Sequence, residues 1–67
     1  MDTQAKIYVA GHNGMVGSAI LRRLRSEGYT NIVVRTRTEL NLLDQAAVQS
    51  FFVSERPEYV FLAAAKV

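Results

Sequence analysis

The chain has 67 residues, a formal net charge of +2 and no cysteine. A chain of this length forms at most one small domain, and without cysteine it holds neither a disulfide framework nor a thiolate metal site. Its 49% of apolar residues indicates a folded chain, while no stretch approaches the roughly 20 apolar residues that span a bilayer. The polar N-terminus does not resemble a signal peptide, so we expect a cytoplasmic protein without membrane contact.

The first third of the chain carries the most informative pattern. Residues 7–10 have strand character and lead directly into three evenly spaced glycines, Gly11, Gly14 and Gly17. Apolar residues then recur every four positions, at Val16, Ile20 and Leu24, which is a helical period. A strand, a glycine turn and a helix in this order predict the opening of a dinucleotide-binding βαβ unit.

Each glycine has a distinct task in such a unit. Gly11 ends the strand at a sharp turn, Gly14 lets the backbone approach a pyrophosphate, and Gly17 lets the helix pack closely against the strand. The phosphates then lie at the helix N-terminus, where unpaired N–H groups and the positive end of the helix dipole favour an anion. The alternative interpretation is a tight turn that binds nothing.

The sequence also resembles a known family. The spacing Gly-x-x-Gly-x-x-Gly is similar to that of the extended short-chain dehydrogenase/reductase superfamily, which acts largely on nucleotide sugars. Three segments, residues 10–20, 35–44 and 63–67, resemble in order the N-terminal part of the GDP-L-fucose synthase family. This resemblance implies an NADPH-dependent enzyme that epimerises GDP-4-keto-6-deoxymannose, reduces it to GDP-L-fucose, and forms a homodimer when full length.

The segments after the first helix complete the expected fold. Gly28 is expected at the C′ position that ends this helix, and residues 31–35 are predicted to form a β-branched strand buried on both faces of a parallel sheet. After a turn, a helix is expected from Gln45 to Arg56, capped by Asp44 and ended by Pro57. Residues 59–63 are predicted to form the third strand. The predicted fold class is α/β, the N-terminal part of a Rossmann-type doubly wound parallel sheet (β-α-β-α-β), and incomplete.

The end of the second strand predicts the coenzyme. An NAD-binding unit commonly has an acid there that binds the ribose 2′-hydroxyl, whereas this chain has Arg35 and Arg37. A guanidinium attracts and grips the 2′-phosphate of NADP, so NADP(H) is predicted over NAD(H). The family resemblance assigns the phosphate to Arg37 with Arg35 as a supporting charge, and an arginine that simply ends a strand in water is the alternative. The family often has an arginine where this chain has Asn13, so a weaker preference is expected here.

Other predicted contacts with the coenzyme come from the loops. His12 either lines the loop beside the cofactor or faces water, and a metal role is not expected for it. By resemblance, the region of Asp44 contacts the adenine, with Leu42 and Leu43 packed nearby, while Ala64 follows the third strand and leaves room for the cofactor. The predicted cofactor-binding residues are Gly11, His12, Asn13, Gly14, Met15, Val16, Gly17, Arg35, Arg37, Leu42, Leu43, Asp44 and Ala64.

Catalytic residues are not expected in this chain. By resemblance, catalysis uses a Tyr-x-x-x-Lys pair with a nearby Ser or Thr, and in the fucose synthases also a Cys and a His. None of Tyr8, Tyr29 and Tyr59 has a lysine four residues later. Residues 1–67 are therefore predicted to form the N-terminal portion of an NADP-binding Rossmann domain, without a substrate domain and inactive alone.

Two other functions stay open at this point. The chain could belong to another NAD(P)-dependent nucleotide-sugar epimerase or dehydratase, such as a 4-epimerase that keeps NAD bound, although Arg35 and Arg37 argue against it. It could also be a freestanding nucleotide-binding module without catalysis. Nucleic-acid binding is not expected, because Arg22 and Arg25 lie on the helix side away from the apolar residues, and that helix has no interleaved aromatic residues to stack on bases.

Overall fold

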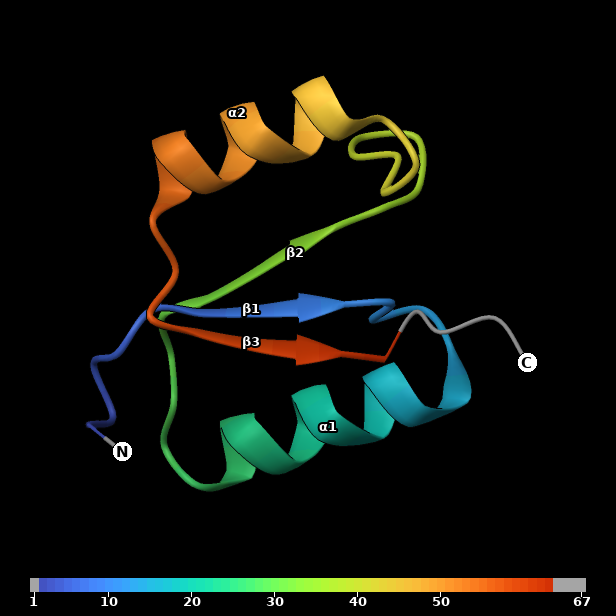
Figure 1. Ribbon diagram of the computed structural model, residues 1–67. Coiled ribbons are helices and arrows are strands. Elements are labelled where there is room, and N and C mark those ends of the chain that lie inside the picture. The colour runs from blue at the N-terminus through green and yellow to red at the C-terminus, as the bar shows by residue number, and fades with distance from the viewer. Residues whose placement is uncertain (1, 64–67) are drawn as a thin grey trace.

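A three-stranded parallel sheet lies between two helices in the computed structural model, which describes residues 2–63. The strand order is β2-β1-β3, and α1 covers one face of the sheet while α2 covers the other (Figure 1). Because all three strands are parallel, their carboxyl ends meet at one edge. The predicted α/β class, with an incomplete doubly wound sheet, is confirmed. The elements are β1 (Ile7–Ala10), α1 (Met15–Ser26), β2 (Ile32–Arg35), α2 (Gln45–Glu55) and β3 (Tyr59–Leu62).

The central strand β1 is the core of the molecule, and all four of its residues are buried. Successive side chains of a strand point to opposite faces, so Tyr8 belongs to the cluster that contains Phe51 of α2, and Val9 to the cluster that contains Leu24 of α1. Fully burying one such apolar side chain stabilises the fold by about 1.5–3 kcal/mol. The strand therefore packs against both helices and positions the carboxyl edge of the sheet, where β1 leads into α1.

The helix ends follow the predicted local chemistry. Gly28 has a φ of 92° and follows the last turn of α1, as predicted for a C′ glycine. Asp44 caps α2 by accepting a hydrogen bond from the N–H of Ala47 at 3.1 Å, so this prediction is also confirmed. The predicted end of α2 is one residue too late, because Arg56 adopts a left-handed conformation with a φ of 49°. The residue before Pro57 is disfavoured in the helical region, and Arg56 is that residue.

Four further predictions need correction. The second strand begins at Ile32 and the third ends at Leu62, each one residue shorter than predicted. The β2 residues are half-buried rather than buried on both faces, because β2 pairs with β1 alone among the described residues. Val16 does not join the apolar face of α1 and is 62% exposed, since the first turn of α1 extends past the carboxyl ends of the strands (Figure 1).

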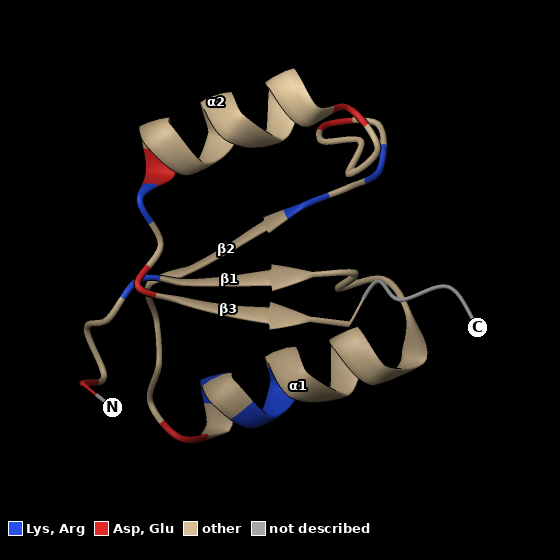
Figure 2. Ribbon diagram, viewed as in Figure 1, with Lys and Arg blue, Asp and Glu red and all other residues tan. Residues whose placement is uncertain are grey.

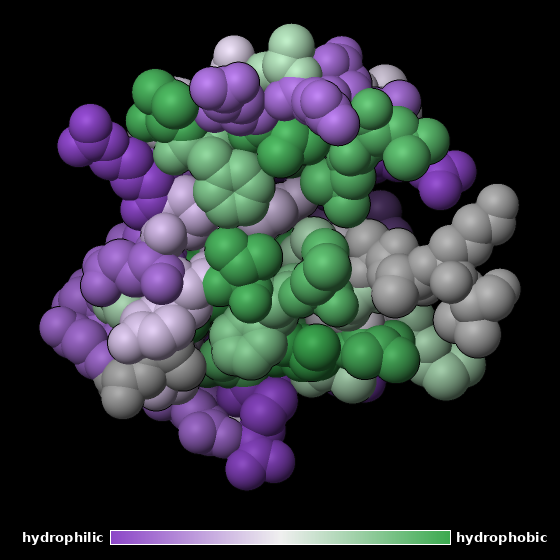
Figure 3. All heavy atoms as spheres, in the orientation of Figure 1, coloured by the Kyte–Doolittle hydropathy of each residue, from purple (hydrophilic) through white to green (hydrophobic). Residues whose placement is uncertain are grey.

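The surface separates charged and apolar regions. Basic residues occupy the C-terminal half of α1 (Figure 2), where Arg22, Arg23 and Arg25 are exposed and Arg23 pairs with Glu27. Apolar side chains gather over β3 (Figure 3), whose Leu62 is 70% exposed. The outer edge of β3 pairs with no other strand in the described part of the chain. Within the same residues, neither helix is long and apolar enough to cross a membrane.

Candidate coenzyme site

A pocket of about 460 Å³ opens at the carboxyl edge of the sheet. The loop after β1, the segment after β2 and the end of β3 all contribute to its wall. Open α/β sheets bind ligands at this edge, outside the carboxyl ends of the strands. The residues that line the pocket are Tyr8, Gly11, His12, Asn13, Gly14, Arg35, Thr36, Arg37, Leu40, Asn41, Leu42, Leu43 and Ala63.

The three loop glycines meet different steric demands. Gly11 has a φ of 85°, a conformation that side chains disfavour. A Cβ on Gly17 would lie 1.8 Å from the carbonyl oxygen of Gly11, so no side chain fits where α1 crosses the end of β1. A Cβ on Gly14 would meet the same oxygen at 3.5 Å, which is ordinary contact. The chain itself therefore tolerates a side chain at Gly14, which lines the pocket.

The N-terminus of α1 faces this loop without a side-chain cap. Gly14 is the N-cap residue, and neither a capping side chain nor an acid occupies the first turn of this described helix. The first N–H groups of a helix have no intrahelical partner and carry the positive end of the helix dipole. Since Met15 and Val16 are also exposed, this end of α1 has the features of an anion site.

The segment after β2 is held by reciprocal hydrogen bonds. The N–H of Glu39 donates to the hydroxyl of Thr36 at 3.2 Å, and the N–H of Thr36 donates to the carboxylate of Glu39 at 2.8 Å. The hydrogen bonds with Thr36 lower the pKa of Glu39, and the charges of Arg35 and His12 add to the shift. Thr-x-x-Glu is a capping-box pattern, a signal in the sequence that our prediction did not use. The box closes the turn that carries Arg37.

The two predicted arginines are in different states. Arg35 donates to the carbonyl oxygen of Val34 at 2.8 Å, lies 3.4 Å from the carboxylate of Glu55, and stacks over the ring of Phe51. The Arg37 side chain is exposed and forms no ion pair with any residue of the described chain. Both residues line the pocket, but Arg37 alone has its guanidinium free for an anion there.

Two further polar groups face the pocket from β1 and its loop. The Nδ1 atom of His12 is buried and has no hydrogen-bond partner among residues 2–63. A buried polar atom without a partner costs free energy that a bound ligand can recover. Burial raises the pKa of the Tyr8 hydroxyl above its ordinary value, and the charge of Arg35 opposes this shift. In the described part of the chain, no group of three His, Cys, Asp or Glu residues could hold a metal ion.

The segment just before α2 supplies two leucines to the pocket wall and one carboxylate that caps the helix. Leu42 and Leu43 line the pocket, and Leu43 is 90% exposed. Its N–H donates to the side-chain oxygen of Asn41 at 3.0 Å, which shapes the turn. Asp44 caps α2 and does not line the pocket.

Comparison with known proteins identifies the family. Residues 7–67 match the NAD dependent epimerase/dehydratase family. The chain belongs to this family. As a family member it is 61% identical over 66 residues to GDP-L-fucose synthase 1 of Arabidopsis thaliana and 57% identical over 65 residues to GDP-L-fucose synthase of Escherichia coli K12. These matches cover 98% and 97% of this chain but 20% of each relative, so the chain spans a fifth of their length.

Solved structures of similar sequence have the same fold. A GDP-mannoheptose C4 reductase from Campylobacter jejuni with NADP bound matches this family member with a TM-score of 0.97 and 49% identity. The match covers 100% of this chain and 21% of the reductase. A GDP-D-glycero-L-gluco-heptose synthase from the same organism, solved in the presence of NADPH, gives the same TM-score and identity.

The pocket collects most of the predicted site residues of this epimerase/dehydratase family member. Met15, Val16, Gly17 and Asp44 lie beside the pocket and do not line it, and Ala64 lies outside the described residues. Five residues that line the pocket were not predicted from the sequence: Tyr8, Thr36, Leu40, Asn41 and Ala63. The predicted residues that line the pocket are Gly11, His12, Asn13, Gly14, Arg35, Arg37, Leu42 and Leu43.

Proposed function

We propose that residues 1–67 are the N-terminal portion of an NADP(H)-binding Rossmann domain and hold the adenine side of the coenzyme. One observation carries this proposal: a single pocket joins Gly14, at the uncapped N-terminus of α1, to the unpaired guanidinium of Arg37. A pyrophosphate and a 2′-phosphate are the two anionic groups of NADP(H), and these two features suit them. Relatives of similar sequence were solved with NADP or NADPH.

Each part of the pocket has a proposed role. The N–H groups at Met15, Val16 and Gly17 bind the pyrophosphate, which approaches closely because Gly14 has no side chain. Arg37 binds the 2′-phosphate, and Asn13 assists without a charge. Leu42 and Leu43 pack against the adenine, with Asp44 behind them and His12 at another wall.

For the full-length protein we propose the reaction of the relatives named GDP-L-fucose synthase. The substrate is then a GDP-4-keto-6-deoxymannose, which is epimerised and reduced to GDP-L-fucose. The coenzyme, when bound, supplies the hydride for the reduction. The residues of this segment bind and orient it, while acid–base catalysis comes from residues outside the segment. We also propose a cytoplasmic homodimer that binds neither nucleic acid nor membrane.

Replacing Arg37 tests the coenzyme assignment. In the full-length protein, Arg37→Gln removes a charge-assisted contact worth about 1.5–3 kcal/mol, so the Kd for NADPH rises by about tenfold or more. The Kd for NADH stays unchanged, because NADH has no 2′-phosphate. Fluorescence titration with both coenzymes measures the two constants.

Arg22→Gln is the matched control. It removes the same charge from the exposed side of α1, away from the pocket, and both Kd values are expected to stay as they are. If Arg37→Gln leaves the NADPH affinity unchanged, or weakens NADH binding equally, the proposed function is wrong.

A further inference from the structure

The guanidinium of Arg35 is occupied by contacts inside the protein. One of its nitrogens donates to the Val34 carbonyl oxygen at 2.8 Å, and the other lies 3.4 Å from a carboxylate oxygen of Glu55. Its Cζ lies 5.4 Å from the centre of the Phe51 ring, within the range of a cation–π contact. These three contacts fix both the position and the plane of the guanidinium.

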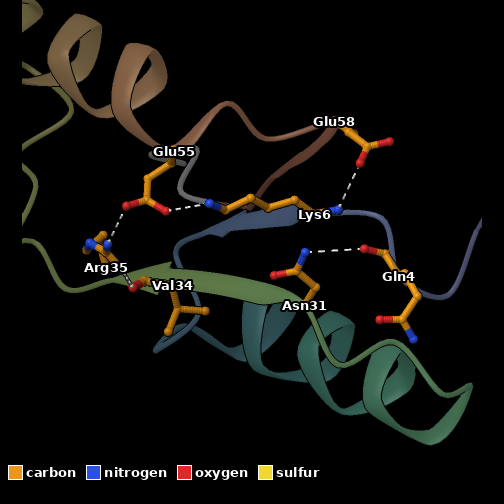
Figure 4. A network of polar contacts seen from close by, with 7 residues as sticks. All are labelled: Gln4, Lys6, Asn31, Val34, Arg35, Glu55 and Glu58. Carbon is orange, nitrogen blue, oxygen red and sulfur yellow. Dashed lines mark hydrogen bonds and ion pairs between the residues drawn. The ribbon is translucent and has the colours of Figure 1, made fainter.

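Glu55 is itself held by a second cation. The Nζ of Lys6 lies 2.8 Å from one carboxylate oxygen of Glu55, and Arg35 approaches the other oxygen (Figure 4). The hydrogen bond with Lys6 lowers the pKa of Glu55, and the charges of Lys6 and Arg35 lower it further. Glu55 is therefore ionised at neutral pH, and its carboxylate bridges the residue before β1 and the last residue of β2.

The direction of α2 decides where this bridge pulls Arg35. Register places Arg35 opposite Ala10, at the carboxyl ends of the strands and beside the pocket. The helix runs back over the sheet, so its last residue, Glu55, lies toward the amino ends of the strands (Figure 1). The contact of Arg35 with the carbonyl of the preceding residue agrees with a side chain that turns back along β2. Arg35 thus lines the pocket while its guanidinium is held by Glu55 and the Val34 carbonyl oxygen.

We propose that Glu55 is a positioning residue for coenzyme specificity. Its ion pair with Arg35 keeps that guanidinium from binding the 2′-phosphate, so that within the described chain Arg37 alone binds this phosphate. The inference rests on the proposed NADP(H) function of the pocket and deepens it. Arg35 is a reserve cation that discriminates between NADPH and NADH only after the bridge to Glu55 is broken.

Glu55→Gln in the full-length protein tests this inference. The amide keeps the shape of the side chain and removes its charge, which frees the Arg35 guanidinium to contact the 2′-phosphate. The ratio of the NADH Kd to the NADPH Kd is expected to rise by about tenfold, the effect of one added charged contact. In an Arg37→Gln background, the same change is expected to restore part of the lost NADPH preference.

A double variant identifies Arg35 as the source of the gain. In Glu55→Gln combined with Arg35→Gln, the Kd ratio is expected to return to its starting value. A gain that persists without Arg35 overturns the inference, and so does a ratio that does not change in Glu55→Gln. If Glu55→Gln does not fold, Glu55→Met gives a chain of similar length that also lacks the charge, with the same expected ratio.

Glu58→Gln is the matched control. The Glu58 carboxylate accepts from the backbone N–H of Lys6 at 3.4 Å, and Arg35 has no contact with it among the described residues. The Kd ratio is expected to stay unchanged in this variant. General damage to the fold weakens the binding of both coenzymes together, and the ratio removes that effect. If Arg37→Gln shifts the ratio and Glu55→Gln does not, the inference fails while the proposed function stands.

Discussion

The loop between β1 and α1 and the loop between β2 and α2 line the same pocket, but different forces shape them. The first is shaped by backbone sterics, because Gly17 lies so close to the Gly11 carbonyl that no Cβ fits. The second is shaped by side-chain hydrogen bonds, because Thr36 and Glu39 bond each other reciprocally and the Asp44 carboxylate accepts from the Ala47 N–H of α2. A steric constraint fails abruptly when an atom is added, whereas each capping bond contributes a modest and separable amount.

The largest effect is expected from Gly17→Ala. The new Cβ overlaps the Gly11 carbonyl at 1.8 Å, and both atoms belong to rigid segments. The free energy of unfolding is expected to fall by about 3 kcal/mol or more, and coenzyme binding is lost with the loop geometry. Thermal and urea unfolding, with NADPH titration, measure both effects.

Gly14→Ala is the matched comparison, three residues away in the same loop. Its Cβ has room at 3.5 Å, so the expected stability loss is about 0.5–1 kcal/mol, from a poorer N-cap residue. NADPH and NADH binding both weaken, because the methyl group occupies the approach of the pyrophosphate. Equal stability losses at the two glycines contradict the steric account of the loop.

The second loop is tested by Thr36→Val. This change keeps the shape of the side chain and removes the hydroxyl that accepts from Glu39. The free energy of unfolding is expected to fall by about 1 kcal/mol. NADPH binding is expected to weaken more than NADH binding, because the turn that carries Arg37 loosens. If the Kd values for NADPH and NADH rise by the same factor, the capping box does not position Arg37.

Asp44→Ala tests the remaining cap without touching the pocket wall. Loss of the bond to the Ala47 N–H is expected to lower the free energy of unfolding by about 1 kcal/mol. Asp44→Asn keeps an accepting oxygen and is expected to stay close to the parent protein. If Asp44→Ala weakens NADPH binding and leaves stability intact, Asp44 contacts the coenzyme rather than the helix.

The smallest expected effect is in the pH dependence of stability. Hydrogen bonds from Thr36 lower the pKa of Glu39, and the hydrogen bond with Lys6 lowers that of Glu55, both from an ordinary value of 4.5. The unfolded chain therefore binds more protons near this pH, so stability is full above 4.5 and falls as the pH drops below it. Urea midpoints between about pH 3 and pH 6 measure this slope. Glu39→Gln is expected to flatten it, and an unchanged slope rules out Glu39 as a source.

Local patterns predicted most of the fold. The glycine spacing, the apolar strand of β1 and the Asp44 cap each depend on neighbours in sequence. All five elements were therefore predicted in order, β1 with its observed bounds and β2, α2 and β3 each with an error of one residue at one end. Val16 was misplaced because helical period alone does not show that the first turn of α1 extends past the strands. The capping box of Thr36 was also local and could have been predicted.

The state of Arg35 could not be predicted in the same way. Its partner Glu55 lies 20 residues away, and the contact depends on α2 packing back over β2. The sequence places Arg35 and Arg37 at the end of one strand. Nothing in their spacing shows which guanidinium forms an ion pair inside the protein and which has none. Long-range packing thus decides which arginine keeps its guanidinium without a partner inside the described chain, and this was the part of the site that required the structure.

The central claim is that this pocket holds NADP(H) with its two anionic groups at two defined places. A crystal structure of the full-length protein with NADP(H) tests it most directly. We predict the pyrophosphate at the N-terminus of α1 beside Gly14 and the 2′-phosphate in contact with Arg37, while Arg35 stays on Glu55. A coenzyme bound away from this edge of the sheet, or with its 2′-phosphate turned from Arg37, contradicts the account.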